Sequence, residues 1–210
     1  MHILAIGSHP DDIEYGCGGT LIKYARQGHG VHLFVATCGS FGGDPEVRHR
    51  EQLRSAEILG VTEVFWGEYT DTQIPLSQEL IARLEQVIRQ VKPHFIFVHS
   101  PEDTHQDHRT LSSCTISATR YIPNVLFYEG PTTQHFLPTV YVDIDATLED
   151  KIELLLAHRS QVAKLYNKDI QDLTIIESAR SCANFRGVQS RVRYAEGFAP
   201  LRLFINIGGE

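Results

Sequence analysis

Short apolar runs alternate along the chain with longer segments in which apolar residues recur every three or four positions. The short runs have the length of buried strands, and the longer segments have the periodicity of amphipathic helices. This pattern predicts strands at residues 1–6, 31–36, 63–66, 95–99, 125–128 and 140–144. It predicts helices at residues 16–27, 45–59, 78–91, 110–121 and 148–166. From residue 169 the pattern weakens, apart from a last strand expected at 201–207.

The order of these elements predicts the fold class. The chain opens with a strand, a loop, a helix and a second strand, a unit that normally joins parallel strands through a right-handed crossover. The alternation continues, and no repeat, low-complexity tract or linker interrupts it. We therefore expect one α/β domain over residues 1–210 with a mostly parallel sheet, against which the C-terminal third packs as an extension.

Composition narrows the class of protein. The chain has 210 residues, 42% hydrophobic and 21% charged, which is typical of a globular domain. No apolar stretch approaches about 18 residues, and the apolar start runs directly into Asp11 and Asp12, so neither a membrane span nor a signal peptide is expected. The formal net charge of -7 disfavours a nucleic-acid partner. The four cysteines form no Cys-x-x-Cys pair, which indicates reduced cysteines and a cytoplasmic location.

Polar side chains crowd two loops that follow predicted strands. His9, Asp11 and Asp12 follow the first strand, and His105 and His108 follow the strand that ends at residue 99. Active sites of open parallel sheets collect at the carboxyl ends of the strands, so both loops are expected at one edge. Within each loop a spacing of three residues can aim two side chains at one cation. Together they offer at least three nitrogen or oxygen ligands, as a catalytic zinc site requires.

Each of these residues also has an ordinary structural explanation. A lone histidine near a strand end is usually hydrogen-bonded in the core, and Asp11 or Asp12 can cap the following helix. The convergence of two clusters favours the metal site. The other histidines have no such setting and are expected at the surface or in packing positions; they are His2, His29, His32, His49, His94, His99, His135 and His158.

The sequence disfavours two other kinds of site, a dinucleotide-binding loop and a serine hydrolase nucleophile. Gly16, Gly18 and Gly19 do not fit the dinucleotide-binding fingerprint, because position 21 is Leu21 and an acidic loop separates the glycines from the strand. We expect them instead to let the start of the helix approach the sheet. No serine stands in a Gly-x-Ser-x-Gly context, which disfavours a serine hydrolase.

The chain resembles the LmbE/PIG-L group of zinc-dependent N-acetylglucosamine deacetylases. The most specific matches are His9-Pro10-Asp11-Asp12 and His105-x-Asp107-His108. Softer matches are the glycines that follow the first motif, Arg48 to Glu51 with Ala56 and Leu59-Gly60, Ser160-Gln161, and Ala195-Glu196-Gly197-Phe198. The resemblance implies a Rossmann-like α/β fold with helices on both faces of the sheet, and hydrolysis of the acetamide of an N-acetylated amino sugar.

The resemblance also implies roles for individual residues. His9, Asp12 and His108 would bind zinc, and Asp11 would be the general base. His105 would stabilise the oxyanion or protonate the leaving amine, and Asp107 would orient His105.

Substrate contacts follow from the same resemblance. Arg48 and Asp71 fall where the family places groups that contact substrate, although residues 69–74 match the family poorly. A surface ion pair with Glu51 is the alternative explanation for Arg48. Gln106 stands where the family often has proline.

Two other functions remain open at this point. Two histidines and one carboxylate also describe the ligands of non-haem iron enzymes, although those enzymes have no need of the adjacent Asp11. A non-catalytic module that binds a sugar or nucleotide is the third hypothesis. The partner expected is a small amino-sugar substrate, and Phe185 and Phe198 are candidates either for a contact in a homo-oligomer or for the core.

Overall fold

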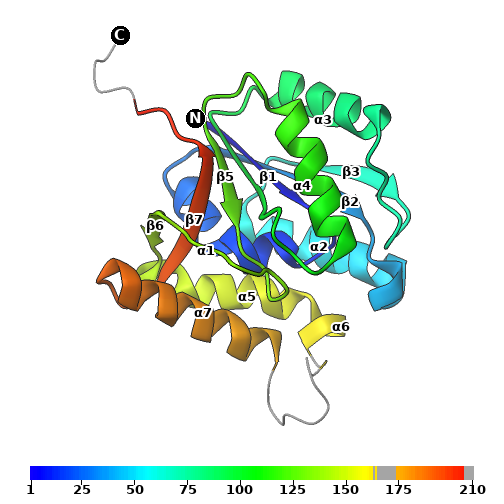
Figure 1. Ribbon diagram of the computed structural model, residues 1–210. Helices are drawn as coiled ribbons and strands as arrows, with labels where there is room; N and C mark the ends of the chain where they lie inside the picture. The colour runs from blue at the N-terminus through cyan, green and yellow to red at the C-terminus, as the bar shows by residue number, and fades with distance from the viewer. Residues whose placement is uncertain (163, 165–173, 206–210) are drawn as a thin grey trace.

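The computed structural model describes residues 1–162, 164 and 174–205 (Figure 1). Its strands are β1 (His2–Gly7), β2 (Gly30–Thr37), β3 (Glu63–Tyr69), β4 (Phe95–His99), β5 (Val125–Tyr128), β6 (Val140–Asp143) and β7 (Ala195–Arg202). Its helices are α1 (Asp12–Arg26), α2 (Pro45–Leu59), α3 (Gln78–Val91), α4 (Gln106–Ala118), α5 (Leu148–Ala157), α6 (Arg159–Val162) and α7 (Ile175–Ser190). Single 3₁₀ turns lie at Ser40–Gly42 and Asp145–Thr147.

The strands form one mixed sheet in the order β3-β2-β1-β4-β5-β7-β6. Strands β1 to β5 are parallel, whereas β7 runs antiparallel to both of its neighbours, β5 and β6. The chain enters the sheet at β1, builds outward through β2 to β3, and crosses back to β4 on the other side of β1. This reversal makes a crevice at the carboxyl ends of β1 and β4, where ligands of such folds bind.

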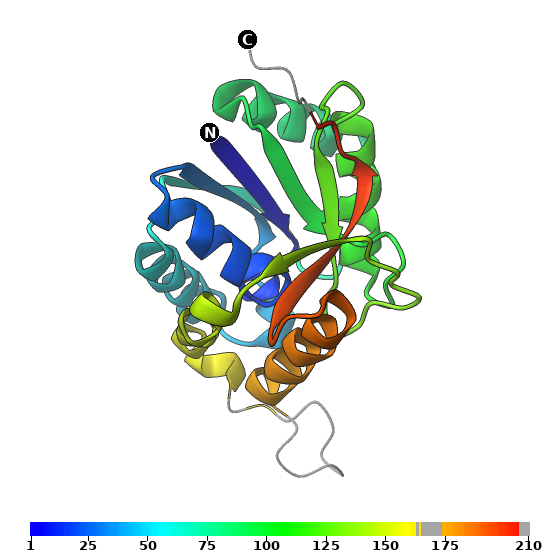
Figure 2. The same cartoon turned by 90° about the vertical axis from the view of Figure 1, so that its left-hand side faces the viewer.

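Helices cover both faces of the sheet, which confirms the expected α/β, Rossmann-like architecture. Helices α3 and α4 lie on one face, and α1, α2 and α5 lie on the other (Figures 1 and 2). Residues 3–6 of strand β1 are all apolar because both faces are buried: Leu4 and Ile6 join the core under α3 and α4, whereas Ile3 and Ala5 join the opposite core. A strand buried on both faces has no polar positions to alternate with apolar ones.

The glycines of α1 allow this helix to pack closely, as predicted. A Cβ atom at Gly16 would lie 2.1 Å from the ring of Tyr128 on β5, and one at Gly19 would lie 2.9 Å from Ile144. The start of α1 therefore touches the sheet, and the loop before it is held at the crevice.

The C-terminal third departs from the sequence prediction. The helix expected at 148–166 is interrupted: α5 ends at Ala157, because His158 turns out of helical geometry and buries its ring 3.5 Å from Glu14 Oε1. Helix α6 follows at Arg159–Val162, and residues 163, 165 and 166 of the expected range lie outside the described part. Helix α7 was not predicted, since its buried face consists of Ala179, Ala183 and Gly187 with Arg186 in place of large apolar residues. The last strand is Ala195–Arg202 rather than 201–207, of which residues 206 and 207 lie outside the described part.

Other expectations have mixed outcomes. All four cysteines are free.

The two phenylalanines considered for a subunit contact differ in burial. Phe198 is fully buried in the core, which excludes it from a subunit contact, whereas Phe185 is exposed. Within the described residues, no helix has both the length and the apolar character that crossing a membrane requires.

Candidate active site

The loop between β1 and α1 places the first two candidate ligands. The His9 backbone N–H donates to Asp12 Oδ2 at 2.7 Å, and His9 Nδ1 lies 3.2 Å from the same oxygen. Between them, Asp11 adopts a left-handed backbone conformation with φ 91°. Residues other than glycine adopt this conformation at a cost, which the surrounding contacts must offset.

The loop between β4 and α4 supplies the third candidate ligand. His108 lies in the first turn of α4, and its Nε2 atom is 3.4 Å from Asp12 Oδ1. One ligand atom each from His9, Asp12 and His108 lies within 4.8 Å of the others. The two loops, which are 99 residues apart at His9 and His108, therefore converge on one point as the sequence predicted.

Both histidines present their second ring nitrogen to a buried carboxylate. His9 Nε2 lies 3.0 Å from Asp71 Oδ1 and 3.2 Å from Asp107 Oδ2, and His108 Nδ1 lies 3.2 Å from Asp103 Oδ2. Carboxylates in this position fix the tautomer and the orientation of histidines that bind metals. Two imidazoles and one carboxylate are also the donor set of catalytic zinc sites, so the residues fit a divalent transition metal.

Asp71 is tied to the loop of residues 39–43 as well as to His9. Its Oδ2 atom accepts a hydrogen bond from the backbone N–H of Phe41 at 2.7 Å. Burial alone would raise the pKa of Asp71, but the contact with His9 and the bond from Phe41 outweigh it and lower the pKa to about 2. Asp71 is therefore ionised at neutral pH, and it lies in the wall of the site.

The Asp107 carboxylate lies near both His9 and His105, and the three residues form a second group of potential metal ligands, whose atoms lie within 4.8 Å of one another. The carboxylate of Asp107 accepts from the backbone N–H groups of Thr72 at 2.7 Å and Ile74 at 3.3 Å. Its own backbone N–H donates to His105 Nδ1 at 3.2 Å. The carboxylate contacts Nε2 of His9 at 3.2 Å, whereas the hydrogen bond between Asp107 and His105 is made by the Asp107 main chain.

His105 caps α4 and faces the other two histidines. Its ring centroid lies 4.8 Å from that of His9 and 4.6 Å from that of His108. Because Nδ1 accepts the bond from Asp107, the proton of a neutral ring sits on Nε2. Burial, together with the nearby His108, lowers the pKa of His105.

Asp11 is a buried acid whose pKa is shifted toward neutrality. Burial raises its pKa to about 6, although the charge of Arg48 opposes the shift. A carboxylate with a pKa near neutrality can accept a proton and release it again, as a general base must.

Arg48 is buried and does not form the ion pair with Glu51 considered as an alternative. Its guanidinium donates to Pro10 O at 2.7 Å and to Gly39 O at 2.8 Å, and it lies 3.4 Å from Asp11 Oδ2. Glu51 instead accepts from the backbone and hydroxyl of Ser160. Arg48 therefore joins the loop that carries Asp11 to the glycine-rich loop beside the site.

Two residues of the site were missed in the sequence. Asp103, which holds His108, lies in the acidic stretch before His105, and nothing in that stretch indicates which acid points inward. His99 ends β4, stacks on His108 with ring centroids 4.0 Å apart, and accepts from the Ser8 backbone N–H at 3.0 Å. Burial lowers the pKa of His99 to about 4, so its ring is uncharged at neutral pH. The ring lies on the buried side of the site.

A cavity of about 470 Å³ opens over the cluster. The predicted site residues that line it are His9, Asp11, Asp12, Arg48, Asp71, His105 and His108. Its outer wall adds Phe41, Gly42, Gln161 and Lys164. Asp107 lies behind His9 and does not line the cavity.

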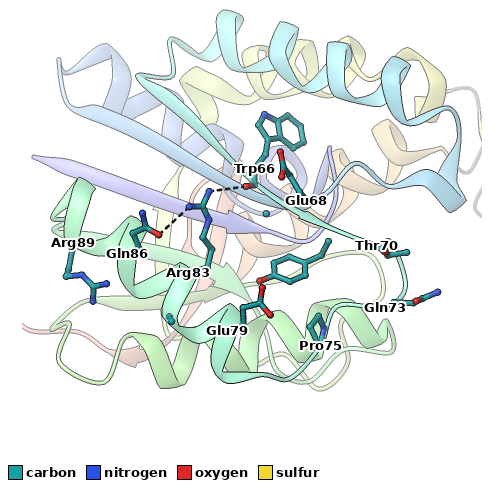
Figure 3. A pocket seen from close by; sticks show the side chains of 12 residues that line it. Trp66, Glu68, Thr70, Gln73, Pro75, Glu79, Arg83, Gln86 and Arg89 are labelled. Carbon is teal, nitrogen blue, oxygen red and sulfur yellow. Dashed lines mark hydrogen bonds between the residues drawn. The ribbon is translucent and has the colours of Figure 1, made fainter.

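A larger hollow of about 860 Å³ lies elsewhere, between β3 and α3 (Figure 3). Its labelled side chains include Glu79 and Arg83, and Arg83 donates to Trp66 O at 3.5 Å. Neither metal-ligand group found among the described residues lies there. The potential metal ligands therefore favour the smaller cavity as the active site.

More than half of the chain matches a known protein family. The family model described as PIG-L: GlcNAc-PI de-N-acetylase matches residues 4–119, a range that contains both ligand loops. The chain is 34% identical over 167 residues to the uncharacterized deacetylase YaiS of Escherichia coli (strain K12), covering 75% of this chain and 90% of the relative. It is 31% identical to diacetylchitobiose deacetylase of Thermococcus kodakarensis, covering 98% of this chain and 85% of the relative.

A solved structure shares the fold over nearly the same length. N,N'-diacetylchitobiose deacetylase from Pyrococcus horikoshii, complexed with an inhibitor, matches with a TM-score of 0.82 and 29% sequence identity. The match covers 95% of this chain and 83% of that chain.

Proposed function

The chain belongs to the GlcNAc-PI de-N-acetylase (PIG-L) family, and from that premise we propose that it is a metal-dependent hydrolase that removes the acetyl group from an N-acetylated amino sugar. The observation that carries the proposal is the convergence of His9, Asp12 and His108 beside a buried acid, Asp11, in one cavity. The two named deacetylase relatives support the reaction type.

We propose zinc as the metal, held by His9, Asp12 and His108. The donor set supports this choice, as do the carboxylates behind both histidines. When bound at such a site, zinc polarises a carbonyl oxygen and makes water acidic enough to ionise near neutral pH.

Asp11 acts as the general base. It lines the cavity next to the ligand Asp12, and the loop that carries it is fixed by Arg48. It takes a proton from the water that attacks the acetamide carbonyl, and its raised pKa suits it to pass that proton on.

His105 supplies the donor on the other side of the reacting group. With Nδ1 accepting from the Asp107 backbone, the neutral ring carries its proton on Nε2, which is free to donate to the negative charge that gathers on the carbonyl oxygen. A donor aimed at developing charge contributes about 3 to 4 kcal/mol in comparable sites.

Residues in the walls of the cavity bind the substrate. Asp71 offers acceptor oxygens for sugar hydroxyls, and Arg48, on α2, offers guanidinium donors. Phe41 is three-quarters exposed at the rim, where its ring can cover an apolar face of a sugar. The four free cysteines support a further proposal, that the protein works in the cytoplasm.

The direct experiment measures acetate release from N-acetylglucosamine, its β-linked dimer and N-acetylglucosamine conjugates by the zinc-loaded protein. We expect acetate and a free amine from at least one of them. Asp11→Asn, loaded with the same metal, is the matched inactive control. Cleavage of a simple peptide amide or ester, with none of the acetamido sugars hydrolysed, would contradict the proposed substrate class. One equivalent of iron in the purified protein would favour the non-haem iron alternative.

A further inference from the structure

Three histidines gather at the amino ends of neighbouring strands, at the opposite end of the sheet from the cavity. His2 opens β1, His32 lies in β2, and His94 immediately precedes β4. The register pairs Leu4 with His32, and His2 stands two residues before Leu4, so His2 and His32 project from the same face. The sequence alone placed these histidines at the surface or in packing positions.

The nitrogens of His2 and His32 have the spacing of two ligands of one ion. His2 Nδ1 lies 3.3 Å from His32 Nε2. Two nitrogens bound to a tetrahedral zinc ion at about 2.0 to 2.1 Å each stand about 3.3 Å apart. His94 fixes the backbone beside them, because its Nδ1 accepts a hydrogen bond from the His2 backbone N–H at 3.0 Å.

Gly30 leaves room for an ion beside both nitrogens. It pairs with His2 in the register, and a Cβ atom there would lie 2.8 Å from His2 Nδ1 and 3.4 Å from His32 Nε2. His32 is only 7% exposed and its ring lies against Phe65, so its position is fixed, whereas His2 is exposed to solvent. An ion can therefore reach a ligand that is already held in place.

We propose that His2 and His32 form a second metal site, which takes a divalent transition metal such as zinc, nickel or copper. Imidazole nitrogens suit these ions. No third His, Cys, Asp or Glu of the described residues forms a ligand group with these two histidines, so water completes the coordination. At about 3.3 Å per strand residue, the site lies roughly 20 Å from His9 and is independent of the proposed catalysis.

The test counts metal equivalents. Zinc-loaded protein is dialysed against increasing Zn²⁺, and separately against Ni²⁺, and bound metal is measured per chain. We expect one equivalent beyond that held by His9, Asp12 and His108. His2→Gln, at an exposed position, is expected to weaken the additional equivalent about tenfold or more. Gly30→Ala is expected to do the same without removing a nitrogen, because its methyl group fills the space.

Two controls separate this site from the catalytic one. His135→Asn changes an exposed histidine elsewhere to a residue that tolerates its φ of 50°, and it should bind both equivalents. His108→Ala should lose the first equivalent and keep the second, whatever the outcome of the activity assays. The proposal is overturned if no additional equivalent binds at millimolar metal, or if His2→Gln or Gly30→Ala binds it as the wild type does.

Discussion

At the scale of single residues, the candidate site is a set of side chains that each make more than one contact. His9 contacts Asp12 through Nδ1 and Asp71 and Asp107 through Nε2. Arg48 holds two carbonyl groups of different loops and approaches a carboxylate. Because the proposed ligands, the proposed base and the residues that support them share these contacts, a substitution at one of them also affects the others.

Replacing Asp11 with asparagine separates proton transfer from metal binding. Asparagine keeps the shape of the side chain but cannot accept the proton, so turnover should fall by about 10² to 10⁴ while one equivalent of metal remains bound. Steady-state kinetics and metal analysis measure the two effects. Asp145→Asn, at an exposed position, is the control and should behave as the wild type. Near-normal turnover of metal-loaded Asp11→Asn would leave Asp11 with a capping role only.

The pH profile reports the same carboxyl group. Burial raises the pKa of Asp11 to about 6, so the group is protonated below that pH and cannot act as a base. We expect kcat/KM to fall as the pH drops through about 6, and a bound cation, which favours the carboxylate, moves this limb to lower pH. The residual activity of Asp11→Asn should lack the limb. A limb centred above pH 7 in the wild type would assign it to another group.

Replacing Arg48 with alanine should affect both activity and stability. The change removes buried hydrogen bonds to Pro10 O and Gly39 O, which costs about 1 to 3 kcal/mol in the free energy of unfolding. It also frees the loop that carries Asp11, so kcat/KM should fall about tenfold to a thousandfold. Arg50→Ala, on the exposed face of the same helix, is the control for chemical denaturation and kinetics. Unchanged kcat/KM in Arg48→Ala would exclude Arg48 from the site.

At the scale of elements, the site depends on how closely α1 and α4 approach the strands that precede them. Helix α1 begins at Asp12, directly after the loop, and its glycines bring it against Tyr128 and Ile144. Helix α4 begins at Gln106 behind the His105 cap. Two of the proposed ligands, Asp12 and His108, thus lie in the first turns of helices, where packing rather than the loop itself fixes the backbone geometry.

Gly16→Ala tests the close approach of α1. A methyl group at Gly16 would meet the Tyr128 ring at 2.1 Å, so the helix or the ring must move, and the free energy of unfolding should fall by about 1 to 3 kcal/mol. Gly18→Ala is the matched control, since its methyl group would lie 3.4 Å from Leu154, close to ordinary contact distance, and alanine favours the helix. Equal stability of the two variants in urea denaturation would contradict this account of the glycines.

At the scale of the whole molecule, the site joins the two parts of the sheet on either side of its switch point. His9 and Asp12 follow β1, whereas His108 follows β4, which the chain reaches only after building β2 and β3. An ion held by all three ligands therefore links segments that are distant in the sequence. A ligand that binds only the folded state stabilises it in proportion to the logarithm of its concentration over Kd.

Metal removal should consequently lower thermal stability. At a free zinc concentration of about 100 Kd, binding adds about 2.7 kcal/mol, which corresponds to roughly 5 to 10 °C in Tm for a chain of this length. Differential scanning calorimetry of the chelated and the zinc-loaded protein measures the change. In His108→Ala most of the shift should disappear, and a full zinc-dependent shift in that variant would refute the ligand assignment.

The sequence by itself determined the repeating βα order, two loops of metal-ligand type and the family, because apolar periodicity and short motifs are local properties. Strands such as β4 and helices such as α2 were predicted at their observed bounds for this reason. The C-terminal third was not: α7 buries small residues, so its helical face carries no large apolar stripe, and β7 depends on pairing with β5 and β6.

Only the tertiary structure decided which polar residues meet. Asp103 and Glu102 are neighbours of like charge, yet packing turns Asp103 toward His108 and leaves Glu102 at the surface. Neither His99 nor His32 belongs to a recognisable motif in the sequence. The register of the strands places His99 against His108, a proposed ligand, and His32 against His2. The physical reason is that the local sequence determines which face of a helix or strand a side chain occupies. Strand order, register and helix packing determine which distant side chain it then contacts.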